Sequence, residues 1–142
     1  MGTVTNSTEL PAPPDQVWAK LADPSQYKDW LTTHAGLAEG GNGPLSQGDT
    51  FKEKVKIMGM PGEVDWTVTE ADEPRRLVLD GKGPMGTSMH TAYELTENGG
   101  STKIDYEAEF GGAALGPMMG PLEKVSKKSA DESLEKLKAL LA

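Results

Sequence analysis

The chain has 142 residues, contains no cysteine, and carries a net charge of −8 because 22 acidic residues outnumber 14 basic ones. This length is typical of one domain, so we expect residues 1–142 to fold around a single core. The lack of cysteine excludes disulfides, thiolate catalysis and cysteine-bound zinc, and the negative charge disfavours nucleic acid as a partner.

Several function classes lack the signals that they require. No stretch of the sequence reaches the roughly 18 apolar residues of a membrane-spanning helix, and the N-terminal residues do not resemble an export signal. We therefore expect no membrane insertion and a cytoplasmic location. Neither the Gly-x-Ser-x-Gly elbow of many hydrolases nor a Gly-Lys-Ser/Thr phosphate loop occurs, and we expect no cofactor.

The first third of the sequence predicts one strand and two short helices. Residues 3–9 are rich in β-branched side chains and end at a proline cluster, which indicates a strand and a turn. Apolar residues then recur at helical spacing over residues 17–22. Asp23 and Pro24 are typical of the cap and first turn of a second helix. Residues 35–49 hold five glycines, so we expect a loop with at most a short strand.

The middle of the sequence predicts a series of antiparallel strands, because apolar and polar residues alternate in successive segments. These segments are residues 51–57, 64–68, 77–79, 85–95 and 102–110, and the turns expected between them include 59–62, 81–86 and 98–100. The last turn, Asn-Gly-Gly, is a strong hairpin signal. A homodimer would form if an exposed edge strand, such as residues 75–81, paired across a two-fold axis.

The C-terminal residues predict one long helix. Its start lies at Pro117 or Pro121, since either proline suits a first helical turn. An apolar and small-residue stripe along it would dock on the sheet, and consists of Leu122, Val125, Ser129, Ser133, Leu137 and Leu140. One strand, two short helices, five or six strands and a long helix together predict the α+β class.

Two segments resemble a known family. The run Leu-Pro-Ala-Pro-Pro-Asp-Gln-Val-Trp, followed by Asp-Pro, Tyr and Trp within residues 10–30, resembles the start of the START-like (SRPBCC) superfamily, especially its polyketide cyclase/dehydratase branch. Residues 100–110 resemble its final strand. The resemblance implies a helix-grip fold, in which a curved antiparallel sheet wraps the C-terminal helix and encloses a cavity for a small apolar ligand. It leaves the chemistry open, since one fold hosts many functions.

We expect the inward faces of the strands and the helix to line this cavity. Candidate ligand-binding residues are Trp30, Phe51, Val55, Ile57, Trp66, Met89, Thr91, Phe110, Met118, Met119, Leu122, Ser126, Ser129 and Ala130. Small residues on the helix either leave space for a ligand or allow close helix–sheet packing. The methionines, likewise, either adapt to varied apolar ligands or fill gaps in the core.

Three polar residues on the inward faces are candidate catalytic groups. Buried Glu53 would act as proton donor or acceptor toward a ligand, whereas at the sheet edge it would only meet water. Tyr93 and Tyr106 would position a carbonyl or hydroxyl, or would only satisfy backbone groups. We expect His34 in an exposed loop, with a place at the pocket mouth beside Trp30 as the alternative, and His90 pointing outward. Neither histidine has an acidic partner at helical or hairpin spacing, so we expect no metal site.

Three functions follow from this pattern. The first is binding of a small hydrophobic or amphipathic molecule, such as a lipid or a polyketide-like ring compound. The second is a polyketide cyclase/dehydratase-type enzyme that uses Glu53 and a tyrosine as acid and base. The third is an interaction protein associated with a toxin–antitoxin pair, as some small bacterial members of the superfamily are named. The sequence predicts a pocket and favours the first function.

Overall fold

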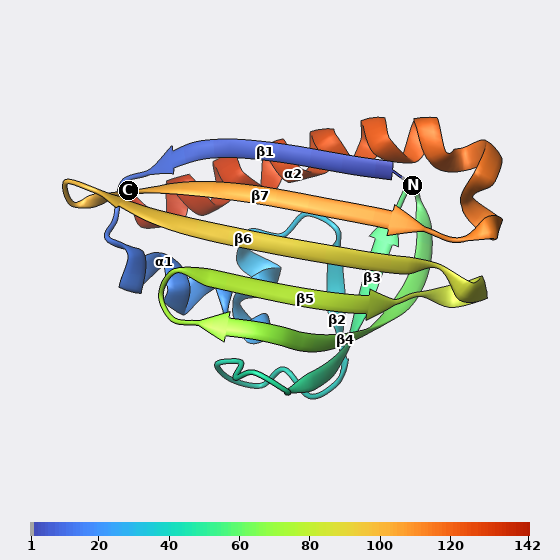
Figure 1. Cartoon of the computed structure of the whole chain (residues 1–142), viewed down its shortest axis with the longest axis horizontal. Helices are drawn as coiled ribbons and strands as arrows, with labels where there is room; N and C mark the ends of the chain where they lie inside the picture. Colours follow the sequence, from blue (N-terminus) through green and yellow to red (C-terminus); the bar gives the residue numbers. More distant parts are fainter. Residues whose placement is uncertain (1) are drawn as a thin grey trace.

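The fold is built on one curved antiparallel sheet, shown in Figure 1 by a computed structural model that describes residues 2–142 apart from the side chains of residues 113 and 114. Its seven strands follow the spatial order β1-β7-β6-β5-β4-β3-β2. They are β1 Gly2–Leu10, β2 His34–Glu39, β3 Thr50–Ile57, β4 Met60–Asp72, β5 Arg76–Lys82, β6 Ser88–Asn98 and β7 Ser101–Gly111. Each strand from β2 to β7 pairs with its successor, and β1 pairs with β7.

Two α-helices and three 3₁₀ helices accompany the sheet. They are α1 Pro14–Leu21, η1 Pro24–Asp29, η2 Pro84–Gly86, η3 Ala113–Met118 and α2 Met119–Leu141. Figure 1 shows α2 lying behind β1 and β7, while β2 and β3 lie behind the other strands. None of these helices combines the length and the apolar character that crossing a membrane demands. The predicted α+β helix-grip arrangement is confirmed, with short helices directly after the first strand.

Local signals in the sequence account for most of these elements. A carboxylate oxygen of Asp23 accepts a hydrogen bond from the Ser25 backbone N–H at 3.0 Å and caps η1, as predicted. In β7, Ile104 and Ala108 are buried whereas Glu107 is exposed. This alternation places one face of the strand toward α2 and the other toward water.

The β3–β4 turn is tighter than the sequence predicted. Ile57 pairs with Met60, so the hairpin turns on Met58 and Gly59 alone. Both have positive φ, 55° and 77°, which a two-residue hairpin turn needs at its central positions. The turn expected at residues 59–62 therefore belongs mainly to β4.

Gly81 lies within the sheet, although the sequence placed it in a turn. It pairs with Trp66 of β4 and Met89 of β6. A Cβ atom at Gly81 would approach the Trp66 ring to 2.8 Å. Glycine is required here because the indole lies directly over β5.

The strand proposed for dimer pairing is not an edge strand. β5 lies in the interior of the sheet, hydrogen-bonded to β4 on one side and to β6 on the other. Its backbone donors and acceptors are already used, so residues 75–81 cannot recruit a second copy. The edges of the sheet are β1 and β2.

The C-terminal half of α2 anchors the helix. Leu134 and Leu137 are buried in the core with side chains of α1 and the strands, and Leu137 is fully inaccessible. Leu140 is 44% exposed, contrary to the predicted stripe, and Leu141 packs on the core in its place. At about 100° per residue, position 141 returns closer to the direction of 137 than position 140 does.

Removing the anchor should destabilise the protein strongly. We expect Leu137→Ala to lower the free energy of unfolding by about 2–5 kcal/mol, since it removes a buried side chain and leaves a void. Leu140→Ala, the same change one turn away on an exposed site, should cost less than about 0.5 kcal/mol. Urea denaturation followed by circular dichroism measures both, and equal losses would contradict the packing described.

Candidate functional site

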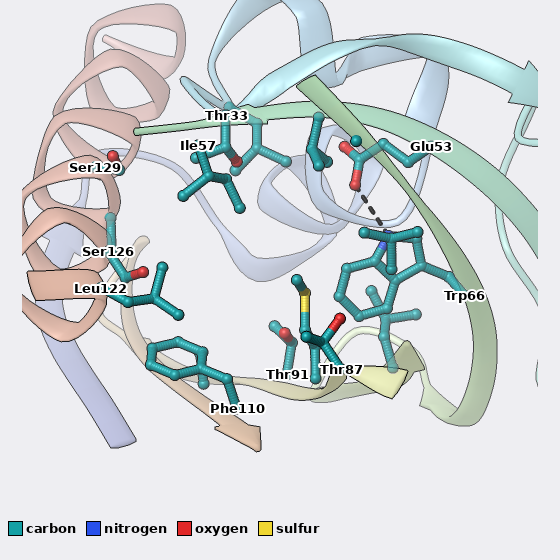
Figure 2. A pocket seen from close by; sticks show the side chains of 18 of the residues that line it. Thr33, Glu53, Ile57, Trp66, Thr87, Thr91, Phe110, Leu122, Ser126 and Ser129 are labelled. Carbon is teal, nitrogen blue, oxygen red and sulfur yellow. Dashed lines mark hydrogen bonds between the residues drawn. The ribbon is translucent and has the colours of Figure 1, made fainter. Parts of the chain in front are cut away.

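A cavity of about 440 Å³ lies between the concave face of the sheet and the N-terminal half of α2 (Figure 2). This volume falls within the roughly 300–1,000 Å³ of typical small-molecule sites. The walls are mainly apolar, and Figure 2 shows Leu122, Ser126 and Ser129 of α2 facing Trp66 across the open space. The site is therefore an apolar pocket with one helical wall of mostly small side chains.

Most of the ligand-binding and catalytic residues predicted from the sequence line this cavity. They are Trp30, Phe51, Val55, Ile57, Trp66, Met89, Thr91, Phe110, Met118, Leu122, Ser126, Ser129 and Ala130, together with Glu53, Tyr93 and Tyr106. The structure adds Tyr27, Thr33, Leu79 and Leu115, which the sequence analysis missed. Tyr27 and Thr33 belong to the segment after α1, where alternation gave no guide to direction.

Four exposed methionines border the cavity, and we call them the methionine rim. Met58, Met60, Met85 and Met118 are 37%, 61%, 85% and 38% exposed and come from the β3–β4 turn, the start of β4, η2 and η3. Met119, also predicted, does not line the cavity. As the first residue of α2 it packs instead beside β1 and β7, in the smaller core cluster.

A buried carboxyl lies on the cavity wall. Glu53 of β3 is only 3% exposed. One of its oxygens accepts a hydrogen bond from the Trp66 indole N–H at 2.9 Å, drawn dashed in Figure 2, and the other lies 2.6 Å from Nδ1 of His34. Glu53 is thus held on both oxygens and is not the water-exposed edge residue of the alternative interpretation.

The strand register explains this cluster. His34 of β2 pairs with Val55, and Trp66 of β4 pairs with Phe51. Glu53 lies two residues from each of those partners, on the same face of β3. His34 and Trp66 are therefore its diagonal neighbours on the two adjacent strands, which long side chains reach across.

The expectation for His34 was wrong. Its side chain is 5% exposed, because residues 34–39 form β2 and place it behind Glu53, with its ring centroid 5.8 Å from that of Tyr27. His90 points outward as predicted, but it also has a carboxylate partner, Asp80, across the β5–β6 pair. Each histidine has one acidic neighbour, and within residues 2–142 no three such side chains converge as a metal site would need.

Two tyrosines meet at the sheet side of the cavity. The rings of Tyr93 and Tyr106 are 5.2 Å apart at their centroids, and neither hydroxyl has a hydrogen-bond partner among the described residues. Burial raises the pKa of both phenols, that of Tyr106 to about 12, and the charge on Glu53 raises both further. Both hydroxyls therefore keep their protons at neutral pH and can donate a hydrogen bond into the cavity.

Comparisons with known proteins agree with this geometry. A family model described as "Polyketide cyclase / dehydrase and lipid transport" matches residues 1–142. Among curated proteins of Mycobacterium tuberculosis, "Toxin Rv0910" is 25% identical over 86% of this chain and 83% of its own length. "Uncharacterized protein Rv1546" is 27% identical over 99% of both chains.

Solved structures share the fold at low identity. A START superfamily protein from Mycobacterium smegmatis has a TM-score of 0.78 at 18% identity, covering 99% of this chain and 97% of its own. Protein CV1439 from Chromobacterium violaceum gives the same TM-score and identity, covering 99% and 98%. The fold expected from the resemblance is thereby confirmed.

Alkaline pH should unfold the protein rather than titrate its tyrosines in place. Burial raises the pKa of all three tyrosines above the ordinary 10.0, with Tyr106 at about 12. Above pH 10 the unfolded chain loses phenolic protons that the folded chain keeps. The free energy of unfolding should therefore fall as pH rises from about 10 to 12, by up to about 1.4 kcal/mol per pH unit for each tyrosine.

Tyrosinate absorbance and circular dichroism, recorded together during an alkaline titration, show whether ionisation of the tyrosines coincides with unfolding. The two signals should change in one transition. A tyrosinate signal that titrates near pH 10 while the dichroism stays native would show that the phenols are accessible to water.

Proposed function

The chain belongs to the polyketide cyclase/dehydrase and lipid transport family, and from this premise we propose that it binds one small apolar or amphipathic molecule between the sheet and α2. The observation that carries the proposal is the cavity of about 440 Å³ with mainly apolar walls. A lipid or a polyketide-like ring compound has the size and polarity that such a space accepts.

The packing of α2 supports this proposal. Protein interiors are normally filled to the density of organic crystals, and an unfilled apolar space forgoes contact energy. Here the C-terminal half of the helix fills its space with Leu134 and Leu137, whereas the N-terminal half presents Ser126, Ser129 and Ala130. A ligand would supply the missing contacts along that half.

The methionine rim suits the entry of apolar molecules. Unbranched thioether side chains adapt their shape at little cost, and Met58, Met60, Met85 and Met118 are exposed while bordering the cavity. Exposed apolar side chains gathered at one opening are typical of ligand-binding grooves. The rim would let a hydrophobic molecule leave water gradually as it enters.

A second candidate function is an enzyme of the cyclase or dehydratase type. The favouring observation is that Glu53 is oriented by His34 and faces a cavity that also holds the protonated Tyr93 and Tyr106. An oriented carboxyl beside proton donors is the arrangement that general acid–base catalysis uses. Turnover of a bound ligand that disappears in Glu53→Gln with binding retained would establish it. The support for a toxin–antitoxin role is the word toxin in the names of curated relatives such as Rv0910 and MT0934.

Filling the cavity should abolish binding. We expect the neutral naphthalene dye prodan to bind the protein with the blue-shifted emission of an apolar site. Ser126→Phe, which points a large ring into the space, should weaken that binding at least about tenfold through steric exclusion. Fluorescence titration measures both affinities.

Lys128→Phe is the matched control, because it adds the same ring to the exposed face of the same helix. It should bind prodan like the unchanged protein. Circular dichroism should show native folds for both variants. Equal binding by Ser126→Phe, or no binding to the unchanged protein, would contradict the proposed function.

A further inference from the structure

We propose that the ligand of this cavity carries a hydrogen-bond donor, such as a hydroxyl, and no negative charge, and that Glu53 selects it. The inference rests on the proposed function and specifies the chemical class of its ligand. It is carried by the His34–Glu53–Trp66 cluster and by the composition of the cavity wall.

The described wall contains one acidic side chain and no basic one. Glu53 is its single carboxyl, and no lysine, arginine or histidine lines the cavity; His34 lies behind Glu53. A carboxylate or phosphate on a ligand would therefore be removed from water with no positive partner in this space. Such burial is costly, and the chain's net charge of −8 adds to the repulsion.

The hydrogen bonds of Glu53 determine what it can offer a ligand. The Trp66 indole N–H can only donate, so the oxygen 2.9 Å away accepts. The other oxygen is 2.6 Å from His34 Nδ1, a distance that places one proton between the two atoms. Either Nδ1–H donates to a carboxylate, or a protonated carboxyl donates to Nδ1.

Both proton positions have the same consequence for the cavity. In both cases the Trp66 N–H is bonded to one oxygen of Glu53, and the shared proton lies between the other oxygen and His34. The positions that the two oxygens still offer to a ligand are therefore acceptor lone pairs. A ligand hydroxyl or amine would satisfy them. A ligand with acceptors alone would bring lone pairs against lone pairs and leave a buried acceptor unpaired, which weakens binding.

The tyrosines do not impose the same demand. The hydroxyls of Tyr93 and Tyr106 rotate and can donate or accept, so they accommodate a hydroxyl, ether or carbonyl equally. His34 acts as a positioning residue, because it holds the second carboxyl oxygen and does not itself line the cavity. The discrimination therefore falls to Glu53.

Three naphthalenes of matched shape test the inference. At neutral pH, 2-naphthol offers a donor, 2-methoxynaphthalene only an acceptor, and 2-naphthoate a negative charge. Each is titrated against the protein–prodan complex, and its competition constant is measured from the loss of dye emission. We expect 2-naphthol to bind about tenfold more tightly than 2-methoxynaphthalene, the effect of one buried hydrogen bond, and 2-naphthoate to bind weakest.

Glu53→Gln should remove the preference. The Trp66 N–H needs an acceptor, so the amide oxygen turns to Trp66, and the amide NH₂ turns to His34 and places its second hydrogen toward the cavity. The ratio of the two affinities should fall to about twofold or less, because a donor now meets the hydroxyl. Glu63→Gln, on the exposed face of β4, is the matched control and should keep the original ratio.

The outcomes separate the two proposals. Suppose that prodan binds. The inference is then overturned if 2-naphthol and 2-methoxynaphthalene compete equally, if 2-naphthoate competes most strongly, or if none of the three competes. In each of these cases the proposed function stands. Absence of binding both by prodan and by 2-naphthol, the latter followed through its own fluorescence, would overturn the proposed function itself. The ligand series on the unchanged protein decides the inference even if Glu53→Gln fails to fold.

Discussion

The packing of Leu134 and Leu137 into the core sets the distance between α2 and the sheet. Near the start of the helix, Met119 and Leu122 pack against the smaller core cluster beside β1 and β7, so α2 is held at both ends. The N-terminal half carries Ser126, Ser129 and Ala130, which are too short to reach the opposite wall, so the cavity follows from the anchor. The cavity thus lies beside the part of the helix whose inward side chains are small, between two segments that pack on the sheet.

The polar end of the site depends on strand register in a comparable way. Glu53, His34 and Trp66 belong to three adjacent strands and meet because they are diagonal neighbours on one face. A slip of one residue in either pairing would turn a partner to the other face. Gly81 contributes from a fourth strand, since only a missing Cβ leaves room for the indole over β5. The position of one carboxyl is therefore fixed by four strands.

The sequence predicted the strands well because one buried face produces a period of two, and it predicted most of the cavity wall for the same reason. It failed where no such period exists. His34 begins a short strand in a glycine-rich segment, so nothing local indicated its burial or its pairing with Glu53. The interior place of β5 follows from the pairing order, which alternation does not encode. The direction of the Met119 side chain depended on where α2 begins, and Pro117 and Pro121 left that boundary open.

The pairing of β1 with β7 has a kinetic consequence. From β2 to β7 every strand pairs with its neighbour in the chain, so these hairpins can form locally and early. Gly2 of β1, by contrast, pairs with Phe110 of β7, and β1 also packs against α2, which is more distant still along the chain. During synthesis β1 emerges well before β7 and must wait for it, with its backbone groups unpaired in the meantime. Folding should therefore finish, rather than start, at the N-terminus, and the partly folded chain exposes the edge of β7 until β1 arrives.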